Sequence, residues 1–339
     1  MIMSVNLVQE KSRFLRYFSN LKDFQYDNMQ FSSNIPAGCI NVTIAPLEHK
    51  SLMLTYRSSR EKYAMIAIQD GVFDLSNALK NKKHVYPLHM PMVNDFLFCL
   101  GEHEKKLLRE LNPSKSVYSY QPKFLSELID LKMENNKKNF DFLITTANTA
   151  YFDDFEFNEL ITLLVNIILE LDKNEHNYIL RIYDPEIISY LEDKIGRKLV
   201  NITTGDFKSV VNNVECVLTT PSTIAVESML LNKPVGTLYY RDEPLLTQTG
   251  WIIHRSSNLP SVVSQMVLKD DDRMLIQSAL LKNYIDVDYT ALNADKIDEI
   301  CKPALINEVI ESASAEMLHS KFNFNLKYFF KRIHSKVFR

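Results

Sequence analysis

The stretch from Val214 to Tyr240 limits the possible folds more than any other part of the chain. An apolar run ends in a turn of small, mostly hydroxylated residues, Thr219 to Thr223, and an amphipathic segment begins there. That segment stops after Leu231, and a second apolar run soon follows. The pattern predicts a strand, a helix and a strand, with hydroxyls and unpaired amides at the helix N-terminus, where anions bind. A phosphate-bearing ligand is therefore expected there, although the turn has no glycine-rich loop.

Short apolar runs alternate with segments of helical period along most of the chain. Strands are predicted in residues 40–45, 63–69, 95–100, 116–120, 140–146, 178–183, 216–219 and 235–239. Helices are predicted in residues 5–21, 102–111, 124–132, 155–171, 185–194 and 222–231, and the part after about residue 258 is expected to be helical. Strands that alternate with helices imply parallel sheets covered by helices on both faces, so the predicted fold class is α/β.

The length of 339 residues fits two ordinary domains better than one large one. The polar run 133–139 interrupts the alternation and is interpreted as a linker. We therefore predict one Rossmann-like domain in residues 1–135, a second in residues 140–319, and a separate basic, aromatic helix in residues 320–339. Two such sheets in tandem predict a ligand cleft between the domains, at the carboxyl ends of the strands.

The composition argues against several classes of protein. A net charge of -3 leaves no excess of cations for binding nucleic acid. The four cysteines lie far apart without any CxxC pair, which argues against a zinc site or a disulfide framework and favours a reduced compartment. The N-terminus lacks an apolar core followed by a cleavage site, and the longest apolar run, residues 160–171, is too short to span a bilayer. We therefore expect a cytoplasmic protein.

Polar segments follow three strands of the predicted second domain. They are Thr145-Thr146-Ala147-Asn148, residues 181–185 and the turn 219–223. Because the carboxyl ends of parallel strands share one edge of a sheet, all three would line the predicted cleft. Their repetition is a second argument for an anionic ligand.

Three motifs carry a resemblance to a known family. The order TTPSTIAVESMLLNKPV resembles the C-terminal domain of GT-B glycosyltransferases, in particular that of the bacterial surface-polysaccharide enzymes. These include the capsule and lipopolysaccharide β-Kdo transferases and the CDP-glycerol glycerophosphotransferases. Upstream, AIQDGVFDLSNAL is similar to the DG-containing motif of the β-Kdo transferases, and DFLFCLGEHEKKLLRELNPSKSVYSYQP resembles the segment that closes their N-terminal domain. The resemblance covers about residues 40–253.

The resemblance implies a GT-B-like fold, with two Rossmann-type domains whose parallel sheets face across a cleft. The domain in residues 1–135 would lie on the acceptor side, and the domain in residues 140–319 would bind the nucleotide sugar. Enzymes with this fold generally hold the donor phosphate with helix dipoles and side chains. No DxD motif stands at a strand end, so we expect no cofactor and a metal-independent reaction.

Asp70 is the candidate catalytic residue. It follows an apolar strand and precedes Gly71. The resemblance implies a catalytic aspartate at this place, acting as nucleophile in a retaining double displacement, whereas an inverting mechanism would use the same carboxylate as general base. The alternative is an ordinary Asp-Gly turn.

The candidate donor-binding residues lie in the second domain. We expect Arg181 and the turn to hold the donor phosphate, and Glu227 to bind the ribose or the sugar. The full candidate set is Arg181, Thr219, Thr220, Ser222, Thr223, Glu227, Thr145, Thr146 and Asn148. One alternative is a plain capping box, with Thr223 as the cap and Glu227 nearby. The chain also departs from the family, because Asp184 stands where a histidine, implied to contact the donor phosphate, usually precedes the proline. Either Arg181 takes over the charge neutralisation or the donor is held differently. Asp184-Pro185 also fits a simple helix start.

Two further segments are candidates for contact with the acceptor or its surroundings. Glu48 and His49 follow a predicted strand and could contact an acceptor sugar, or could belong to a surface loop. The range 321–339 is rich in Lys, Arg and aromatic residues and contains no acid. Such a helix suits the interface of an anionic membrane, or it could pack back across the two domains.

These observations predict a glycosyltransferase that moves a sugar from a nucleotide donor to a surface polysaccharide or glycolipid. The favoured donor is a CMP-linked acidic sugar such as Kdo or sialic acid. The expected partners are the nucleotide-activated sugar, a glycan or lipid-linked glycan, and the inner-membrane surface, but no nucleic acid. We expect the protein to be cytoplasmic and peripheral on the cytoplasmic face of the membrane. The alternatives are a polyol-phosphate transferase with a CDP donor and a non-catalytic protein of the same fold that binds a glycan or a partner.

Overall fold

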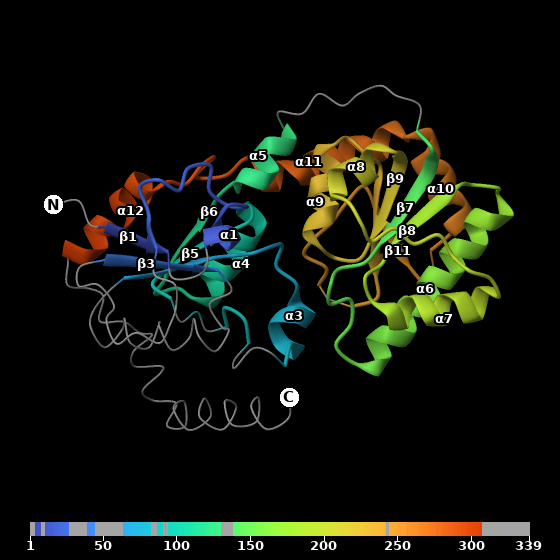
Figure 1. Ribbon diagram of the computed structural model, residues 1–339, viewed down its shortest axis with the longest axis horizontal. Helices are drawn as coiled ribbons and strands as arrows, with labels where there is room; N and C mark the ends of the chain where they lie inside the picture. The colour runs from blue at the N-terminus through green and yellow to red at the C-terminus, as the bar shows by residue number, and fades with distance from the viewer. Residues whose placement is uncertain are drawn as a thin grey trace. The chain divides into compact units, whose positions relative to one another are not determined.

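The computed structural model describes residues 4–7, 11–26, 39–44, 64–82, 87–90, 92, 94–129, 138–241, 244–255 and 257–306. The chain divides into two compact units (Figure 1). Unit 1 comprises Met1–Asp70, Asn81–Phe124 and Val287–Arg339, and unit 2 comprises Gly71–Lys80 and Leu125–Asp286. Neither unit is therefore one continuous range such as 1–135 or 140–319, because the chain leaves unit 1 after Asp70 and returns to it twice.

Unit 1 contains a six-stranded sheet in the order β2-β1-β3-β4-β5-β6. Its strands are β1 (Ser4–Leu7), β2 (Gln25–Tyr26), β3 (Cys39–Ile44), β4 (Met65–Ile68), β5 (Phe96–Cys99) and β6 (Ser116–Ser119). All five strand pairs are parallel. Every residue of β4 and of β5 is buried, which explains why these strands appear in the sequence as unbroken apolar runs. The described helices of this unit include α1 (Lys11–Phe14), α4 (Glu102–Leu111) and α12 (Ala294–Ile306).

Unit 2 contains a five-stranded parallel sheet in the order β11-β10-β9-β7-β8. Its strands are β7 (Phe140–Thr145), β8 (Tyr178–Arg181), β9 (Val214–Thr219), β10 (Val235–Tyr239) and β11 (Trp251–His254). Its helices are α3 (Leu75–Lys80), α6 (Asp154–Lys173), α7 (Pro185–Ile195), α8 (Phe207–Asn212), α9 (Thr223–Leu230), α10 (Leu259–Leu268) and α11 (Asp271–Ile285). Helix α5 (Lys123–Ile129) spans the point where the chain passes from unit 1 into unit 2.

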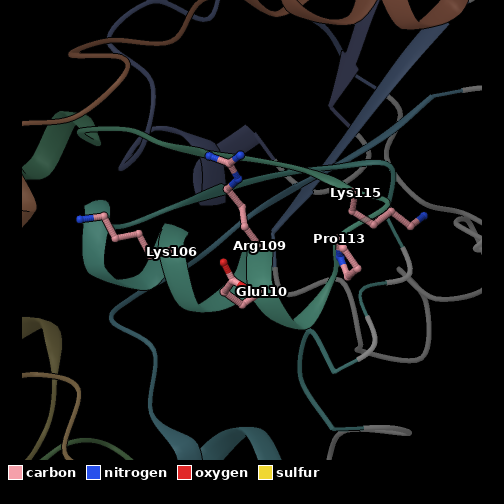
Figure 2. Close-up of a pocket in the computed structure, with 5 residues that line it drawn as sticks. All are labelled: Lys106, Arg109, Glu110, Pro113 and Lys115. Carbon is pink, nitrogen blue, oxygen red and sulfur yellow. The ribbon is translucent and has the colours of Figure 1, made fainter.

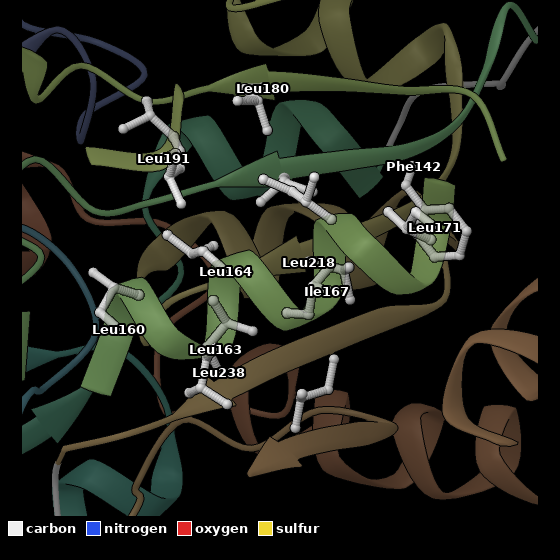
Figure 3. Packing of buried hydrophobic residues seen from close by; sticks show 14 of the residues in the cluster. Phe142, Leu160, Leu163, Leu164, Ile167, Leu171, Leu180, Leu191, Leu218 and Leu238 are labelled. Atoms are coloured by element: carbon white, nitrogen blue, oxygen red, sulfur yellow. The ribbon is translucent and has the colours of Figure 1, made fainter. Parts of the chain in front are cut away.

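Helix α6 forms one side of the unit 2 core. Its buried leucines and isoleucines recur every three or four residues, so one face of the helix is continuously apolar. Figure 3 shows this face against side chains from four strands of the sheet, Phe142, Leu180, Leu218 and Leu238. Asp153 starts the helix by accepting a hydrogen bond from the backbone N–H of Glu156 (2.9 Å). This well-packed layer supports the strand ends at which the candidate site lies.

Most predicted elements are confirmed, but one prediction is wrong. The eight predicted strands and the helices after residue 100 are present, with boundaries shifted by a few residues at most. The helix predicted over residues 5–21 is instead strand β1, followed by the short helix α1. The prediction also omitted β2, α3, α8 and β11. These are short elements, and apolar runs of four residues do not distinguish a strand from a helical turn.

No helix in the described part of the chain combines the length and the apolar character that crossing a bilayer requires. The basic segment 320–339 and the acceptor candidates Glu48 and His49 lie outside the described residues. So does most of the predicted linker, since residues 130–137 are not described.

Candidate functional site

In each sheet the first strand in the sequence lies between the second and the third, so later strands are added on the side opposite the second strand. In unit 2, β7 pairs with β8 on one side and with β9 on the other, so the strands added later lie on the side away from β8. Ligands of open α/β sheets collect outside the carboxyl ends of the strands at such a switch point. Here the last residues of the two strands, Thr145 and Thr219, are paired across the switch. The residues that follow them are therefore the natural place for a ligand site in this unit.

The two polar segments that follow β7 and β9 lie together, as the sequence predicts. The backbone N–H of Ala147 donates to the hydroxyl of Thr220 (2.7 Å), and the N–H of Thr220 reaches the carbonyl of Thr145 (3.4 Å). The hydroxyls of Thr219 and Ser222 are hydrogen-bonded to each other (3.2 Å). The turn is thus held by its own hydroxyls and backbone.

Helix α9 begins at this turn without a side-chain cap. Its N-cap is Ser222, whose side chain makes no capping hydrogen bond, and the first turn contains no acid. The capping box with Thr223 as the cap is therefore wrong. The first turn of α9 therefore brings no carboxylate of its own to the partial positive charge of the helix N-terminus, which suits an anionic ligand. Glu227 lies one turn further along the helix and is buried.

Thr146 supplies a second observation at the same place. Thr146 is 3% exposed, and its hydroxyl has no hydrogen-bond partner among the described residues. A buried hydroxyl without a partner is uncommon, because leaving it unsatisfied costs free energy. A bound ligand could satisfy it. Of its neighbours, Thr145 donates its hydroxyl hydrogen to the carbonyl of Arg181 (2.8 Å), and Asn148 is exposed.

Arg181 is placed at the end of β8 but binds the protein backbone. Its guanidinium donates to the carbonyls of Ile202 (3.1 Å), Thr204 (3.0 Å) and Gly205 (2.8 Å), and the residue is 5% exposed. In this structure it therefore holds the loop after α7 in place, and a phosphate would have to share these donors. The helix start at Asp184 is confirmed, since its carboxylate accepts the N–H of Glu186 (2.9 Å).

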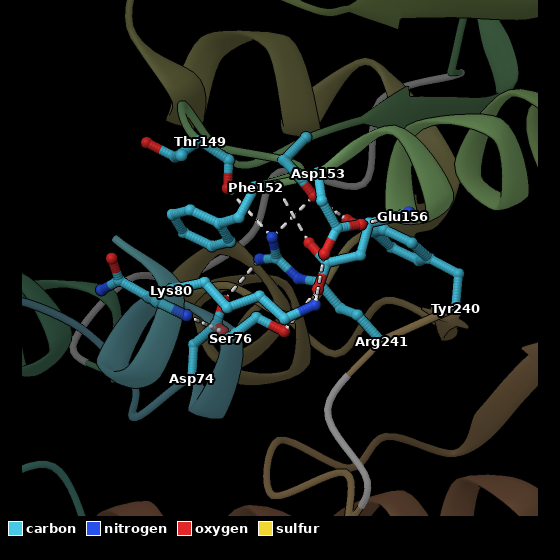
Figure 4. A network of polar contacts seen from close by, with 11 residues as sticks. Asp74, Ser76, Lys80, Thr149, Phe152, Asp153, Glu156, Tyr240 and Arg241 are labelled. Atoms are coloured by element: carbon cyan, nitrogen blue, oxygen red, sulfur yellow. Dashed lines mark hydrogen bonds and ion pairs between the residues drawn. The ribbon is translucent and has the colours of Figure 1, made fainter. Parts of the chain in front are cut away.

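The segment Gly71–Lys80, which directly follows Asp70 in the chain, belongs to unit 2 and is fastened there by polar contacts (Figure 4). The N–H of Val72 donates to the hydroxyl of Thr223 (3.2 Å) at the start of α9. Gly71 passes so close that a Cβ atom on it would lie 2.7 Å from the same hydroxyl oxygen. The residue after the candidate catalytic aspartate is thus packed against the candidate phosphate site.

Arg241 is the centre of this network, and the sequence analysis missed it. Its guanidinium forms a buried ion pair with Asp74 and donates to the carbonyl of Ala150 (2.6 Å). On α3, Ser76 donates to Glu156 (2.8 Å), and Lys80 pairs with the same carboxylate. Its position could have indicated it, because Arg241 comes shortly after the apolar strand β10. Polar side chains at the carboxyl edge of a parallel sheet often contact ligands.

Asp70 itself lies in unit 1, just beyond the end of β4, and is exposed. The hydroxyl of Tyr17 donates to its backbone carbonyl (3.1 Å). A cavity of about 240 Å³ lies beside it, lined by Ser12, Arg13, Arg16, Tyr17, Ile44 and Asp70. The structure therefore places the candidate catalytic carboxylate at the carboxyl edge of its sheet, as the Asp-Gly position after a strand predicts.

A larger cavity of about 400 Å³ lies elsewhere in unit 1 (Figure 2). It is lined by Lys106, Arg109, Glu110, Pro113 and Lys115. Lys115 precedes β6 and pairs with Asp95, which precedes β5 (3.8 Å), so this end of the cavity lies at the amino edge of the sheet. Burial lowers the pKa of Lys115, which agrees with a partly structural role. Despite its size, this cavity is at the wrong edge for the ligand of an open α/β sheet.

Within the described ranges, no three His, Cys, Asp or Glu side chains are grouped so that they could hold a metal ion. The described cysteines Cys99, Cys216 and Cys301 are buried free thiols. The polar groups of the unit 2 site are thus hydroxyls, backbone amides and the carboxylate of Glu227.

Comparison with known proteins gives structural matches only. No protein-family model matches the sequence, and no curated protein sequence matches it. A structure from Listeria monocytogenes, provisionally named a UDP-N-acetylglucosamine 2-epimerase, matches with a TM-score of 0.58 and 10% identity over 91% of this chain and 98% of that one. The Methanocaldococcus jannaschii UDP-GlcNAc 2-epimerase in complex with UDP-GlcNAc and UDP matches with a TM-score of 0.54 and 14% identity over 90% and 99%. TarM matches with a TM-score of 0.47 and 12% identity, and this chain spans 55% of the TarM chain.

These identities are too low to show more than the fold, and the TarM match carries no argument. The two stronger matches extend over nearly the whole of both chains. They confirm the predicted fold class, a GT-B-like chain with two α/β units built on parallel sheets.

Proposed function

We propose that this chain is a nucleotide-sugar-dependent glycosyltransferase and that unit 2 binds the phosphate of the donor. The observation that carries the proposal is the uncapped N-terminus of α9 at the switch point between β7 and β9. Phosphate oxygens would accept hydrogen bonds from the first amides of α9 and from the hydroxyls of Ser222 and Thr146. As the sugar leaves, negative charge grows on the nucleotide, and these fixed donors would stabilise it without reorganising. Neutral donors and a helix dipole would supply this stabilisation, and we propose that the reaction is metal-independent.

Asp70 would carry the chemistry at the sugar. In an inverting reaction its carboxylate accepts the proton of the acceptor hydroxyl as that oxygen attacks the anomeric carbon. In a retaining reaction it attacks the anomeric carbon itself and expels the nucleotide; in a second step the acceptor hydroxyl displaces the carboxylate, which takes up the hydroxyl proton as it is freed. Both routes use the exposed side chain at the end of β4, and product stereochemistry distinguishes them.

Two finer assignments rest on the sequence resemblance: a CMP-linked acidic sugar such as Kdo or sialic acid as donor, and a surface polysaccharide or glycolipid as acceptor. Contact of residues 320–339 with the cytoplasmic face of the membrane is proposed from their basic, aromatic composition. Glu48 and His49 are proposed to contact the acceptor. A polyol-phosphate transferase with a CDP donor would use the same phosphate site, and a screen of UDP, CDP, CMP and GDP compounds separates these donors.

A second candidate function is epimerisation of a nucleotide sugar at C2. It is favoured by the match of nearly the whole chain to the Methanocaldococcus jannaschii UDP-GlcNAc 2-epimerase. The two reactions differ in what they need, because epimerisation requires no acceptor. Incubation with UDP-GlcNAc alone, followed by NMR, tests it: a C2 epimer formed without acceptor would replace the glycosyltransferase proposal.

The test of the phosphate site is Ser222→Asp. Aspartate is a good N-cap, so the variant should fold at least as stably as the wild type. Its carboxylate would occupy the helix N-terminus and repel a phosphate, which should weaken nucleotide binding at least about tenfold. Binding is measured by calorimetry with the nucleotide that gives the largest thermal shift in the screen.

The matched control is Asn258→Asp. Asn258 is the exposed N-cap of α10 in the same unit and also makes no side-chain capping hydrogen bond. The added charge there should leave nucleotide affinity unchanged. If Ser222→Asp binds the nucleotide as tightly as the wild type, the helix N-terminus is not the phosphate site.

A further inference from the structure

Thr223, the first residue of α9, has a hydroxyl whose oxygen is held by the chain while its hydrogen is unused. The oxygen accepts the backbone N–H of Val72 (3.2 Å), and Thr223 is half-buried, so a ligand can still reach it. A threonine hydroxyl has one hydrogen to donate besides the lone pairs with which it accepts. Within the described ranges, no acceptor takes that hydrogen. The hydroxyl is therefore a fixed oxygen with a donor to spare.

This donor lies at the helix end where we propose that the phosphate binds. The Cα–Cβ bonds of an α-helix are tilted toward its N-terminus, so the side chain of the first residue lies beside the unpaired amides. The N-cap, Ser222, makes no side-chain hydrogen bond to these amides. The buried hydroxyl of Thr146 also has no partner in the described part of the chain, and the adjacent Ala147 is bonded to the same turn. Two hydroxyls thus have hydrogens to offer an anion here.

Val72 joins the Thr223 hydroxyl to the chain that carries Asp70. Only Gly71 stands between Asp70 and Val72, so their Cα atoms are at most about 7 Å apart. The contact is close, because a Cβ atom on Gly71 would lie 2.7 Å from the hydroxyl oxygen of Thr223. A change in the bond between Val72 and Thr223 therefore acts on the backbone directly beside Asp70.

We propose that Thr223 is a positioning residue that links the donor phosphate to the segment after Asp70. With the phosphate bound, the hydroxyl donates its hydrogen to a phosphate oxygen and still accepts the N–H of Val72. Hydrogen bonds in such a chain polarise and strengthen one another, and the bond to a charged oxygen is the strongest of them. The proposal rests on the proposed donor site and adds to it a way in which the bound donor fixes the backbone beside Asp70.

The coupling has to act in both directions. If the phosphate strengthens the bond to Val72, that bond strengthens phosphate binding by the same factor. The competing explanation is that Thr223 only fastens Val72 to α9. Such a clamp would hold the Val72 amide equally well with and without ligand, and its loss would leave nucleotide affinity unchanged.

The experiment compares Thr223→Val, which keeps the shape of the side chain and removes the hydroxyl, with Thr223→Ser, which keeps the hydroxyl. The full chain is labelled with ¹⁵N-valine, and the amide signal of Val72 is identified by its absence from Val72→Ile. In the wild type and in Thr223→Ser, the nucleotide with the largest thermal shift should move the Val72 amide proton downfield. In Thr223→Val this movement should be absent. Calorimetry should show nucleotide binding to Thr223→Val weakened about three- to tenfold, the size expected for one lost hydrogen bond.

The control variant is Thr162→Val. Thr162 is an exposed threonine of α6 in the same unit, and its hydroxyl donates to the carbonyl of Asn158 (2.8 Å). This variant should keep the wild-type affinity and the wild-type Val72 signal. The proposal is overturned if the Val72 signal of the wild type does not respond to nucleotide, if the response persists in Thr223→Val, or if Thr223→Ser behaves like Thr223→Val. Thermal unfolding of each variant checks that the chain is folded.

The outcome is separable from that of the proposed function. If Ser222→Asp weakens nucleotide binding and Thr223→Val does not, the donor site stands and the link through Thr223 is refuted. If no nucleotide binds to the wild type, the donor site is refuted, and inorganic pyrophosphate becomes the probe. A Val72 response to pyrophosphate that disappears in Thr223→Val would then support the link for an anion other than a nucleotide. No response in the wild type would refute the link as well.

Discussion

At both switch points the first strand of the sheet lies between the second and the third, but the polar groups beside it differ. At the unit 2 switch the groups are hydroxyls and backbone amides around the uncapped start of α9, with the buried carboxylate of Glu227 one turn further along the helix. At the unit 1 switch they are charged side chains, two arginines and an aspartate, around a small cavity. The hydrogen-bond donors at the unit 2 switch are thus uncharged hydroxyls and amides, whereas those at the unit 1 switch include charged side chains.

The difference determines how each site should respond to substitution. A site made of backbone amides keeps its donors when one side chain is removed, and it is damaged mainly by moving the backbone or adding a charge. A site made of charged side chains loses its function when one of them is neutralised. The variants below test this contrast, because each should affect one unit and spare the other.

The largest effect is expected for Asp70→Asn. The amide cannot accept the acceptor proton or attack the anomeric carbon, so turnover should fall by about a hundredfold to ten-thousandfold. Nucleotide affinity, which we assign to unit 2, should stay within about twofold of the wild type. Both are measured once a donor is known from the nucleotide screen. Asp23→Asn, an exposed aspartate of unit 1, is the control and should keep wild-type turnover. Equal rates for Asp70→Asn and wild type would remove Asp70 from the mechanism.

Asp74→Ala should give the largest loss of stability. It would leave the guanidinium of Arg241, whose side chain is 1% exposed, without its carboxylate partner. Breaking a buried ion pair by removing one partner costs about 3–5 kcal/mol, which urea unfolding can measure. As a control, Arg255→Ala breaks a pair with Glu159 in which the arginine is 61% exposed, and it should cost at most about 1 kcal/mol. Similar losses for the two variants would mean that the network of Figure 4 does not support unit 2.

Much of the fold could be predicted because the central strands of both sheets are buried on both faces. Runs such as Met65–Ile68 and Phe96–Cys99 have no polar residue, so they stand out from the helical segments around them. Strand β1 could not be recognised in this way. Its sequence, SVNL, fits a helical turn equally well, and it is a strand only because it pairs with β3 more than thirty residues later.

The candidate site shows the same limit. That the segments after β7 and β9 would meet followed from parallel strands ending at one edge, and the structure confirms it. The contacts of Arg181 with the carbonyls of residues 202–205 could not be foreseen, because a sequence gives no sign of which backbone groups a guanidinium will reach. The pair of Asp74 with Arg241 joins residues far apart in the chain. Arg13 and Arg16 were not recognised as lying at the carboxyl edge of a sheet, because residues 5–21 were predicted to form one helix and strand β1 was missed.

Gly71→Ala should have an intermediate effect and tests whether the unit 2 site is sensitive to backbone displacement. The added methyl group would lie 2.7 Å from the hydroxyl oxygen of Thr223, so the chain or the first residue of α9 must move. Overpacking of this kind costs about 1–3 kcal/mol of stability, and displacing the helix start should weaken nucleotide binding as well. The double variant Gly71→Ala/Thr223→Ala relieves the clash and should recover part of both. An unchanged nucleotide affinity in Gly71→Ala would show that the site does not depend on this close approach.

The smallest effect is expected for Tyr17→Phe, which probes how Asp70 is positioned in unit 1. The substitution removes the hydrogen bond to the backbone carbonyl of Asp70 and keeps the ring, so stability should fall by only about 0.5–1.5 kcal/mol. Turnover should fall several-fold through kcat, with nucleotide affinity unchanged, because the carboxylate is held less firmly.

Since burial raises the pKa of Tyr17 to about 12, its ionisation lies outside pH 6–9, and the variant should keep the shape of the pH–rate profile there. Tyr190→Phe, on an exposed tyrosine of unit 2, should change neither quantity. A Tyr17→Phe enzyme with a shifted pH profile would mean that the phenol itself exchanges a proton during the reaction, and its assignment as a positioning residue would be wrong.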